Sequence, residues 1–145
     1  MRKSIAFVVL IGIFWVSQAV AGNDDAMNKF LGLWHVDFER TMEAAKKSPK
    51  YSAKDAERLP AMVKKMVQMM QIKLANDSMS YVRGSREMNL PYRVKTASGD
   101  SATVSCSRGN KTFDVRFTLI EGKYMNFKST ASDDMDYYIW KRTEG

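Results

Sequence analysis

Hydrophobic and polar residues alternate over eight stretches of this chain, which is the pattern of β-strands that bury one face. The first stretch runs from Leu31 to Glu39, with Trp34, Val36 and Phe38 on one side. The others lie at 72–74, 79–81, 87–95, 102–107, 113–119, 123–129 and 137–142. Short turns such as the one at 108–110 separate several of them, so neighbouring strands are predicted to be antiparallel.

Between the first two strands the apolar spacing becomes helical. Thr41 is predicted to cap a short helix that ends at Lys47, and Ser52 with Asp55 resembles the capping box of a second helix that reaches Gln71. Pro60 removes a backbone donor inside this second helix, which predicts a kink or two short pieces. The apolar positions of the second helix fall within one arc, at Leu59, Met62, Val63, Met66, Val67, Met69 and Met70.

Eight antiparallel strands in sequence can close into an up-and-down β-barrel without free edges. We therefore predict a mainly β protein, an eight-stranded barrel with a two-piece helical insert between strands one and two. Residues 22–145 form its single domain, because no linker or repeat divides them. A barrel of this size is either filled by its own side chains or holds one small ligand, and the alternation leaves both options open.

Residues 1–21 have the features of a secretory signal peptide. Arg2 and Lys3 precede an apolar stretch at 5–16, and Ala19 and Ala21 form a small-x-small cleavage pattern. The apolar stretch is shorter than a membrane span, and no cysteine follows it for lipidation. We expect a periplasmic or secreted protein that begins near Gly22, is not a lipoprotein and has no stable membrane insertion after cleavage.

The formal charge of the 145-residue chain is +7, and it falls to +5 without the two basic residues of the leader. Seven basic residues lie in the helical segment between Lys46 and Lys65, so the excess is local. We expect no nucleic-acid partner, because the basic residues are not interleaved with exposed aromatic ones. This basic segment could attract anionic amphiphiles or an anionic bilayer surface. Alternatively, its charges are the solvent-exposed side of an amphipathic helix.

Candidate catalytic chemistry is sparse. The chain has one histidine and one cysteine and lacks the common zinc, phosphate-loop and nucleophile-elbow motifs, so we expect no cofactor, no metal and no enzymatic activity. The methionines at 62, 66, 69 and 70 could bind Cu(I), but an apolar lid over a barrel is the favoured interpretation. Cys106 shares the inward face of its strand with Val104 and is interpreted as a core residue.

Gly32-Leu33-Trp34 near the start of the predicted domain, together with Arg142 in its last strand, resembles the calycin superfamily, which includes lipocalins and fatty-acid-binding proteins. The resemblance implies that Trp34 and Arg142 form a structural pair across the barrel floor. The helical pair after the first strand is similar to the fatty-acid-binding branch. That branch has ten strands and an R-x-Y carboxylate clamp, whereas this chain has eight and continues Arg142-Thr143-Glu144, so the clamp does not carry over.

Two functions follow from these patterns. The first is a non-enzymatic carrier or sensor that holds a small hydrophobic or amphipathic molecule inside the barrel, under a methionine-rich lid. Its expected lining is Trp34, Phe38, Met62, Met66, Met70, Tyr92, Phe113, Phe117, Tyr138 and Trp140. The alternative is a protein-interaction module, such as an envelope inhibitor or stress protein, whose barrel is solid and whose partner is another protein.

Overall fold

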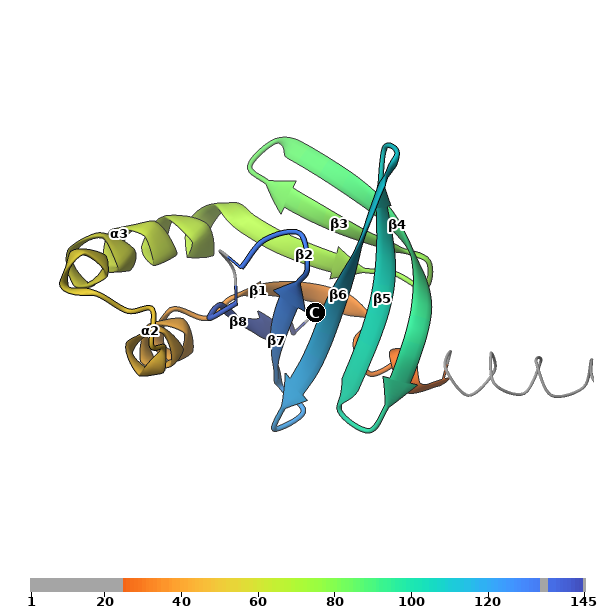
Figure 1. The fold of residues 1–145 in the computed structure, drawn as a ribbon, viewed down its shortest axis with the longest axis horizontal. Helices are drawn as coiled ribbons and strands as arrows, with labels where there is room; N and C mark the ends of the chain where they lie inside the picture. Colours follow the sequence, from red (N-terminus) through yellow and green to blue (C-terminus); the bar gives the residue numbers. More distant parts are fainter. Residues whose placement is uncertain (1–24, 134–135, 145) are drawn as a thin grey trace, which may run out of the picture.

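The computed structural model describes residues 25–133 and 136–144, so the expected leader at 1–21 and its cleavage site lie outside the described residues. Eight antiparallel strands form a closed barrel in which each strand pairs with the next and the last pairs with the first (Figure 1). This confirms the predicted fold class. The strands are β1 (Gly32–Val36), β2 (Met70–Leu74), β3 (Ser78–Arg83), β4 (Arg86–Ser98), β5 (Ser101–Arg108), β6 (Lys111–Ile120), β7 (Tyr124–Ser129) and β8 (Ile139–Arg142).

The pairing register defines which residues face the barrel interior, because opposed residues of antiparallel strands point to the same side. Val104 lies opposite Val94 on β4 and opposite Val115 on β6. Val104 and Val115 are fully buried, whereas Thr103 and Ser105 beside Val104 are only half-buried. The alternation read from the sequence is therefore the inside-outside pattern of the barrel wall.

One end of the barrel, here called the floor, is closed around Trp34. The guanidinium of Arg142 lies over the Trp34 ring at 4.5 Å from its centroid and donates from Nη1 to the Leu31 carbonyl at 2.6 Å. Trp34 Nε1 donates to the Phe30 carbonyl at 2.9 Å. Gly32 has a φ of +125°, and a Cβ there would lie 3.3 Å from Arg142 Nη1. Gly32 therefore allows both the backbone turn and the close approach of Arg142.

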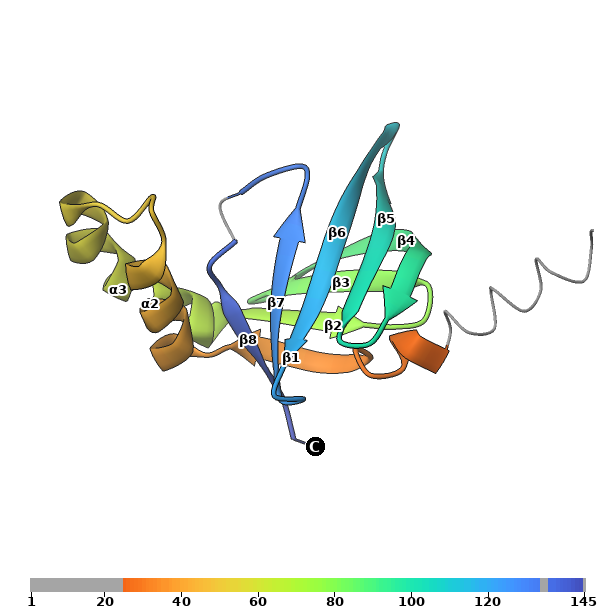
Figure 2. The same ribbon diagram turned by 60° about the horizontal axis from the view of Figure 1, so that its bottom comes forward.

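The two helices lie at the opposite end, here called the mouth. They are α2 (Phe38–Lys47) and α3 (Ala53–Met69), and they connect the mouth end of β1 to β2. Figure 2 shows both helices beside that end of β1, while the helical turn at 25–27 lies at the floor end. α2 contacts β8, and α3 contacts β1 and β2. The predicted helical insert between the first two strands is confirmed.

The boundary between β1 and α2 differs from the sequence expectation. β1 ends at Val36, and Asp37 caps α2 by accepting from the Arg40 amide at 2.9 Å. The predictions that the strand continues to Glu39 and that Thr41 is the cap were wrong. Thr41 is buried one turn inside the helix, where its hydroxyl accepts from Ile139 N at 2.9 Å and donates to Ile139 O. Its polar group fastens α2 to β8 instead of capping the helix.

α3 begins as predicted and continues further than its proline suggested. Ser52 and Asp55 form the reciprocal hydrogen bonds of a capping box. The helix then runs through Pro60 to Met69 as one element, so a division into two short helices is not seen. Pro60 removes a single helical hydrogen bond, while Leu59 and Val63 beside it are buried in the core. We attribute the continuity of the helix to this packing.

Candidate functional site

Large side chains fill the barrel from the floor up to Trp140, which lies opposite Val36. Phe30 and Phe117 lie with ring centroids 6.0 Å apart, and Phe127 and Trp140 with centroids 5.5 Å apart. These four side chains are at most 2% exposed. Close packing of this kind leaves little room for a ligand at the floor.

A pocket of about 660 Å³ lies at the mouth, on the inner side of β2, β3 and β4. Its lining residues are Met70, Tyr81, Arg83, Arg86, Glu87 and Met88. Met70 lies opposite Arg83, and Tyr81 lies opposite Met88, so these four share the inner face. Met88 is 38% exposed although it is a large apolar residue. A pocket of this size with an apolar lining and a few polar groups is typical of small-molecule sites.

The aromatic core continues from this pocket into the barrel. The ring of Tyr81 lies 6.4 Å from that of Phe127, which in turn contacts Trp140. Trp140 is fully buried, and its indole Nε1 has no hydrogen-bond partner among the described residues. Buried indole N–H groups usually have a partner, so this donor is an unusual feature of the interior.

The titratable groups of the interior are held in their neutral forms. Burial raises the pKa of the Cys106 thiol to about 11, with a smaller contribution from the Asp114 carboxylate. Burial likewise raises the pKa of Tyr81 and of Tyr92 to about 12. At neutral pH these groups can donate hydrogen bonds or pack against apolar atoms. A thiol with so high a pKa is a poor nucleophile, and neither phenol is tuned for proton transfer.

The ten residues expected to line a ligand site are dispersed over several environments. Trp34, Phe117, Tyr92 and Trp140 are buried on the inner faces of the barrel strands, and Phe113 is half-buried on the inner face of β6. Met70 lines the mouth pocket. The remaining four are Phe38, Met62, Met66 and Tyr138, of which Phe38, Met62 and Met66 belong to the helices and Tyr138 directly precedes β8.

The helices border a second concave surface, which shares no lining residue with the mouth pocket. This groove, of about 740 Å³, is bordered by the α2–α3 connection, β7 and the segment before β8. Tyr51, Leu59, Met62 and Tyr137 contribute its apolar surface. Met62 is 51% exposed there, while Met66 is half-buried against the core. The methionines of α3 therefore do not act as one group.

Sequence reasoning did not select Tyr81, Met88 or the two arginines of the mouth pocket. Tyr81 and Met88 both follow the alternating pattern, so their inward orientation was readable. What the pattern does not show is that the part of β4 before Tyr92 lies beyond its pairing with β5, so that these side chains border a pocket. The available signal for both residues was this alternation, which is most regular around Met88.

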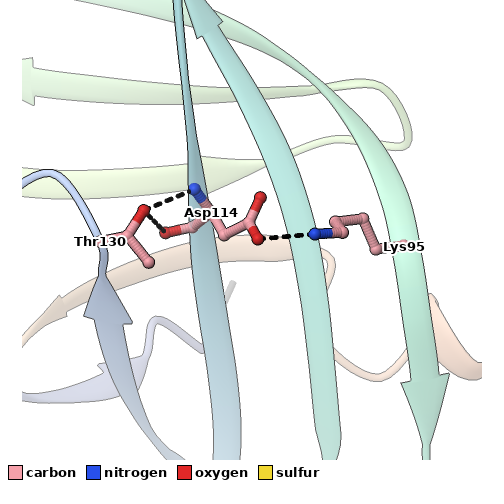
Figure 3. A network of polar contacts seen from close by, with 3 residues as sticks. All are labelled: Lys95, Asp114 and Thr130. Atoms are coloured by element: carbon pink, nitrogen blue, oxygen red, sulfur yellow. Dashed lines mark hydrogen bonds and ion pairs between the residues drawn. The ribbon is translucent and has the colours of Figure 1, made fainter.

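A polar network on the outside of the barrel joins three segments (Figure 3). Lys95 Nζ contacts Asp114 Oδ2 at 2.7 Å, and the Asp114 amide donates to Thr130 Oγ1 at 2.9 Å. Lys95 lies at a register shift in β4 between Val94 and Thr96, which lets its side chain reach past β5 to β6. The groups of this network bond to one another away from both concave surfaces, which indicates a structural role.

Within the described ranges, no three His, Cys, Asp or Glu residues are grouped closely enough to hold a metal ion. None of the helices in this part of the chain is long and apolar enough to cross a membrane. No protein-family model matches the chain, and no curated protein or solved structure matches it.

Proposed function

We propose that this chain is a non-enzymatic binding protein that takes up a small hydrophobic or amphipathic molecule at the mouth of its barrel. The observation that carries the proposal is the 660 Å³ pocket whose apolar lining includes a partly exposed Met88. Leaving such a side chain accessible forgoes the free energy of burying it, about 1.5–3 kcal/mol for complete burial. A ligand tail placed against Met70, Tyr81 and Met88 would recover part of that energy.

The proposal moves the expected ligand from the centre of the barrel to its upper part, because the floor half is occupied by aromatic side chains. It also includes export through the leader at residues 1–21 and a distant relationship to calycin barrels. The closed eight-stranded topology and the Trp34–Arg142 contact are consistent with that relationship. Mass spectrometry of the protein from a cell-envelope fraction tests the export, since a chain that begins near Gly22 is expected.

The experiment for binding uses the chain from residue 22 and 11-(dansylamino)undecanoic acid, a probe that brightens in apolar surroundings. Saturable enhancement that unlabelled fatty acids reverse is expected. The variant Met88→Gln should weaken binding, because it places an amide in the apolar lining. The matched control is Met62→Gln, which alters the other exposed methionine, in the other groove, and should leave the affinity unchanged. Absence of saturable binding by the unaltered protein would refute the proposal.

A second candidate is a protein-interaction module, and the groove beside the helices favours it. Exposed Met62 with Tyr51 and Tyr137 forms an apolar surface next to charged residues such as Lys47 and Lys128. If this groove is the functional surface, a purified protein partner binds at one-to-one stoichiometry. Met62→Gln then weakens the complex and Met88→Gln does not, which is the reverse of the result expected for the ligand carrier.

A further inference from the structure

Two adjacent hairpins at the mouth end in nearly the same four residues. The β3–β4 turn reads Arg83-Gly84-Ser85-Arg86, and the β5–β6 turn reads Arg108-Gly109-Asn110-Lys111. In both hairpins the two basic residues are direct cross-strand partners, so each turn has two residues. Gly84 and Gly109 have φ of +61° and +62°, and a two-residue hairpin turn needs such a positive φ at its first residue. Figure 1 shows both tips at the upper edge of the view but apart from each other, since the pairing of β4 with β5 does not extend past Tyr92 and Cys106.

The register turns all four basic residues toward the barrel axis. Residues two apart on a strand share a face, so Arg108 lies on the face of buried Cys106, and Lys111 on that of Phe113. On the other hairpin Arg83 follows Tyr81 on the inner face, and Arg86 lies opposite it. We call these four the rim cations: Arg83, Arg86, Arg108 and Lys111.

The rim cations lack counter-ions in the described part of the chain. Each is exposed, and none forms an ion pair or a side-chain hydrogen bond with another described residue. Glu87 borders the same pocket, but it lies opposite Val82 on the outer face and forms no ion pair with either arginine. Like charges placed directly opposite each other destabilise a hairpin. Arg83 and Arg86 border the mouth pocket, so an anion bound there would relieve the repulsion within that pair.

The interior offers no comparable partner for an anion. Of the described strand residues, Arg142 is the other cation on the inner face, and its guanidinium is engaged by Trp34 and by the carbonyls of Leu31 and Lys29. A carboxylate or phosphate inserted toward the floor would lose its hydration without gaining a free cation, which is strongly unfavourable. An anionic head group is therefore favoured at the rim, and an apolar tail is favoured inside.

We propose that the ligand of the mouth pocket is an anionic amphiphile, bound with its head group at Arg83 and Arg86 and its tail directed inward along Met88 and Tyr81. This inference rests on the proposed binding function and adds the charge and the orientation of the ligand. The guanidinium groups suit a carboxylate or a phosphate, because both can accept two parallel hydrogen bonds from one arginine.

The test compares 11-(dansylamino)undecanoic acid with its methyl ester, two probes that differ in one charge. The unaltered protein should bind the acid at least about tenfold more tightly, the equivalent of about 1.4 kcal/mol from one charge-assisted contact. The difference should shrink as NaCl is raised toward 1 M, since salt screens exposed charges. In the variant R83Q/R86Q the acid should lose this advantage while the ester still binds.

The matched control removes the same charge from the outer wall, in the variant K73Q/R93Q. It should keep the preference for the acid, whereas an equal loss would overturn the rim site in favour of a general effect of net charge. Equal affinity of the unaltered protein for acid and ester overturns the inference but leaves the binding function standing. If neither probe binds, the binding function itself fails.

Two further arms distinguish the sources of the anion. Inorganic phosphate at millimolar concentration should not displace the acid, because it has no tail to place in the pocket, and full displacement would overturn the amphiphile. Vesicles of phosphatidylglycerol and of phosphatidylcholine test a membrane surface. Binding to the anionic vesicles without binding of the monomeric acid would likewise overturn the proposal.

Discussion

Arg142 is predicted to be the residue whose loss most directly opens the barrel floor. Its guanidinium contacts the Trp34 ring and donates to the carbonyls of Leu31 and Lys29, which fastens the N-terminal segment to β8. In Arg142→Met both hydrogen bonds and the cation–π contact are lost. At this partly hydrated site each hydrogen bond contributes about 1 kcal/mol and the ring contact about 0.5–1 kcal/mol. The expected loss in the free energy of unfolding is about 2–3 kcal/mol.

Urea denaturation followed by tryptophan fluorescence measures this change, and the thermal midpoint should fall by about 10 °C for a domain of this size. Arg142→Lys should recover only part of the loss, because one ammonium group cannot donate to both carbonyls and contact the Trp34 ring at the same time. Arg93→Met, on the outer face of β4, is the control and should stay within about 0.5 kcal/mol of the unaltered protein. Hydrogen exchange should accelerate locally at the Phe30 amide, which donates to Met27 O.

The floor interpretation is refuted if Arg142→Met unfolds at the same urea concentration as the Arg93→Met control. It is also refuted if stability falls but exchange at residues 27–31 is unchanged, since the arginine would then act elsewhere. Either result would mean that Trp34 is held by apolar packing alone.

Three other predictions concern the core. Thr41→Val should cost about 1–3 kcal/mol in urea denaturation, because the Ile139 amide loses its hydroxyl acceptor while the Ile139 carbonyl keeps the Asp37 amide; Thr41→Ser should keep most of the stability. Phe117→Ala should cost about 3–5 kcal/mol by the same assay, since it leaves a cavity beside Phe30. The Cys106 thiol should react with Ellman's reagent at pH 8 only after unfolding. Because its pKa is raised to about 11, the folded thiol stays protonated at pH values where the thiol of the unfolded chain, with a pKa near 8.5, loses its proton. The free energy of unfolding should therefore fall as the pH rises above about 8.5, which urea midpoints at pH 8 and 10.5 would show.

The fold was predictable because strand alternation in this chain is nearly uninterrupted. In β5 each inward residue from Ala102 to Cys106 is apolar and each outward one is Thr or Ser, so a shift of one residue would bury hydroxyl groups. The connections were equally clear, because short turns allow only antiparallel neighbours. Eight strands in that order leave barrel closure as the arrangement without free edges.

The errors arose where two local signals competed. Phe38 continues the alternation of β1, yet it is the first residue of α2, because Asp37 caps that helix by accepting from the Arg40 amide. Thr41 has the chemistry of a helix cap and is used inside the helix, because Ile139 offers it two backbone partners. Pro60 signals a break that the packing of α3 overrides. The partner of Thr41 and the core that packs α3 beside Pro60 are remote in sequence. Asp37 is a local capping signal that competes with the strand pattern.

The sequence by itself determined the number of strands, their order and the side of each strand that is buried, because these properties depend on local spacing and on turn length. It also contained the two basic hairpin tips as separate tetrapeptides. Only the tertiary structure decided that these tips face one mouth, that Arg142 reaches Trp34, and that the methionines divide between a pocket and a groove. Barrel closure brings together residues that are distant in sequence, such as Trp34 and Arg142, which are 108 positions apart. Spatial proximity of this kind depends on the pairing of every intervening strand, so no local pattern records it.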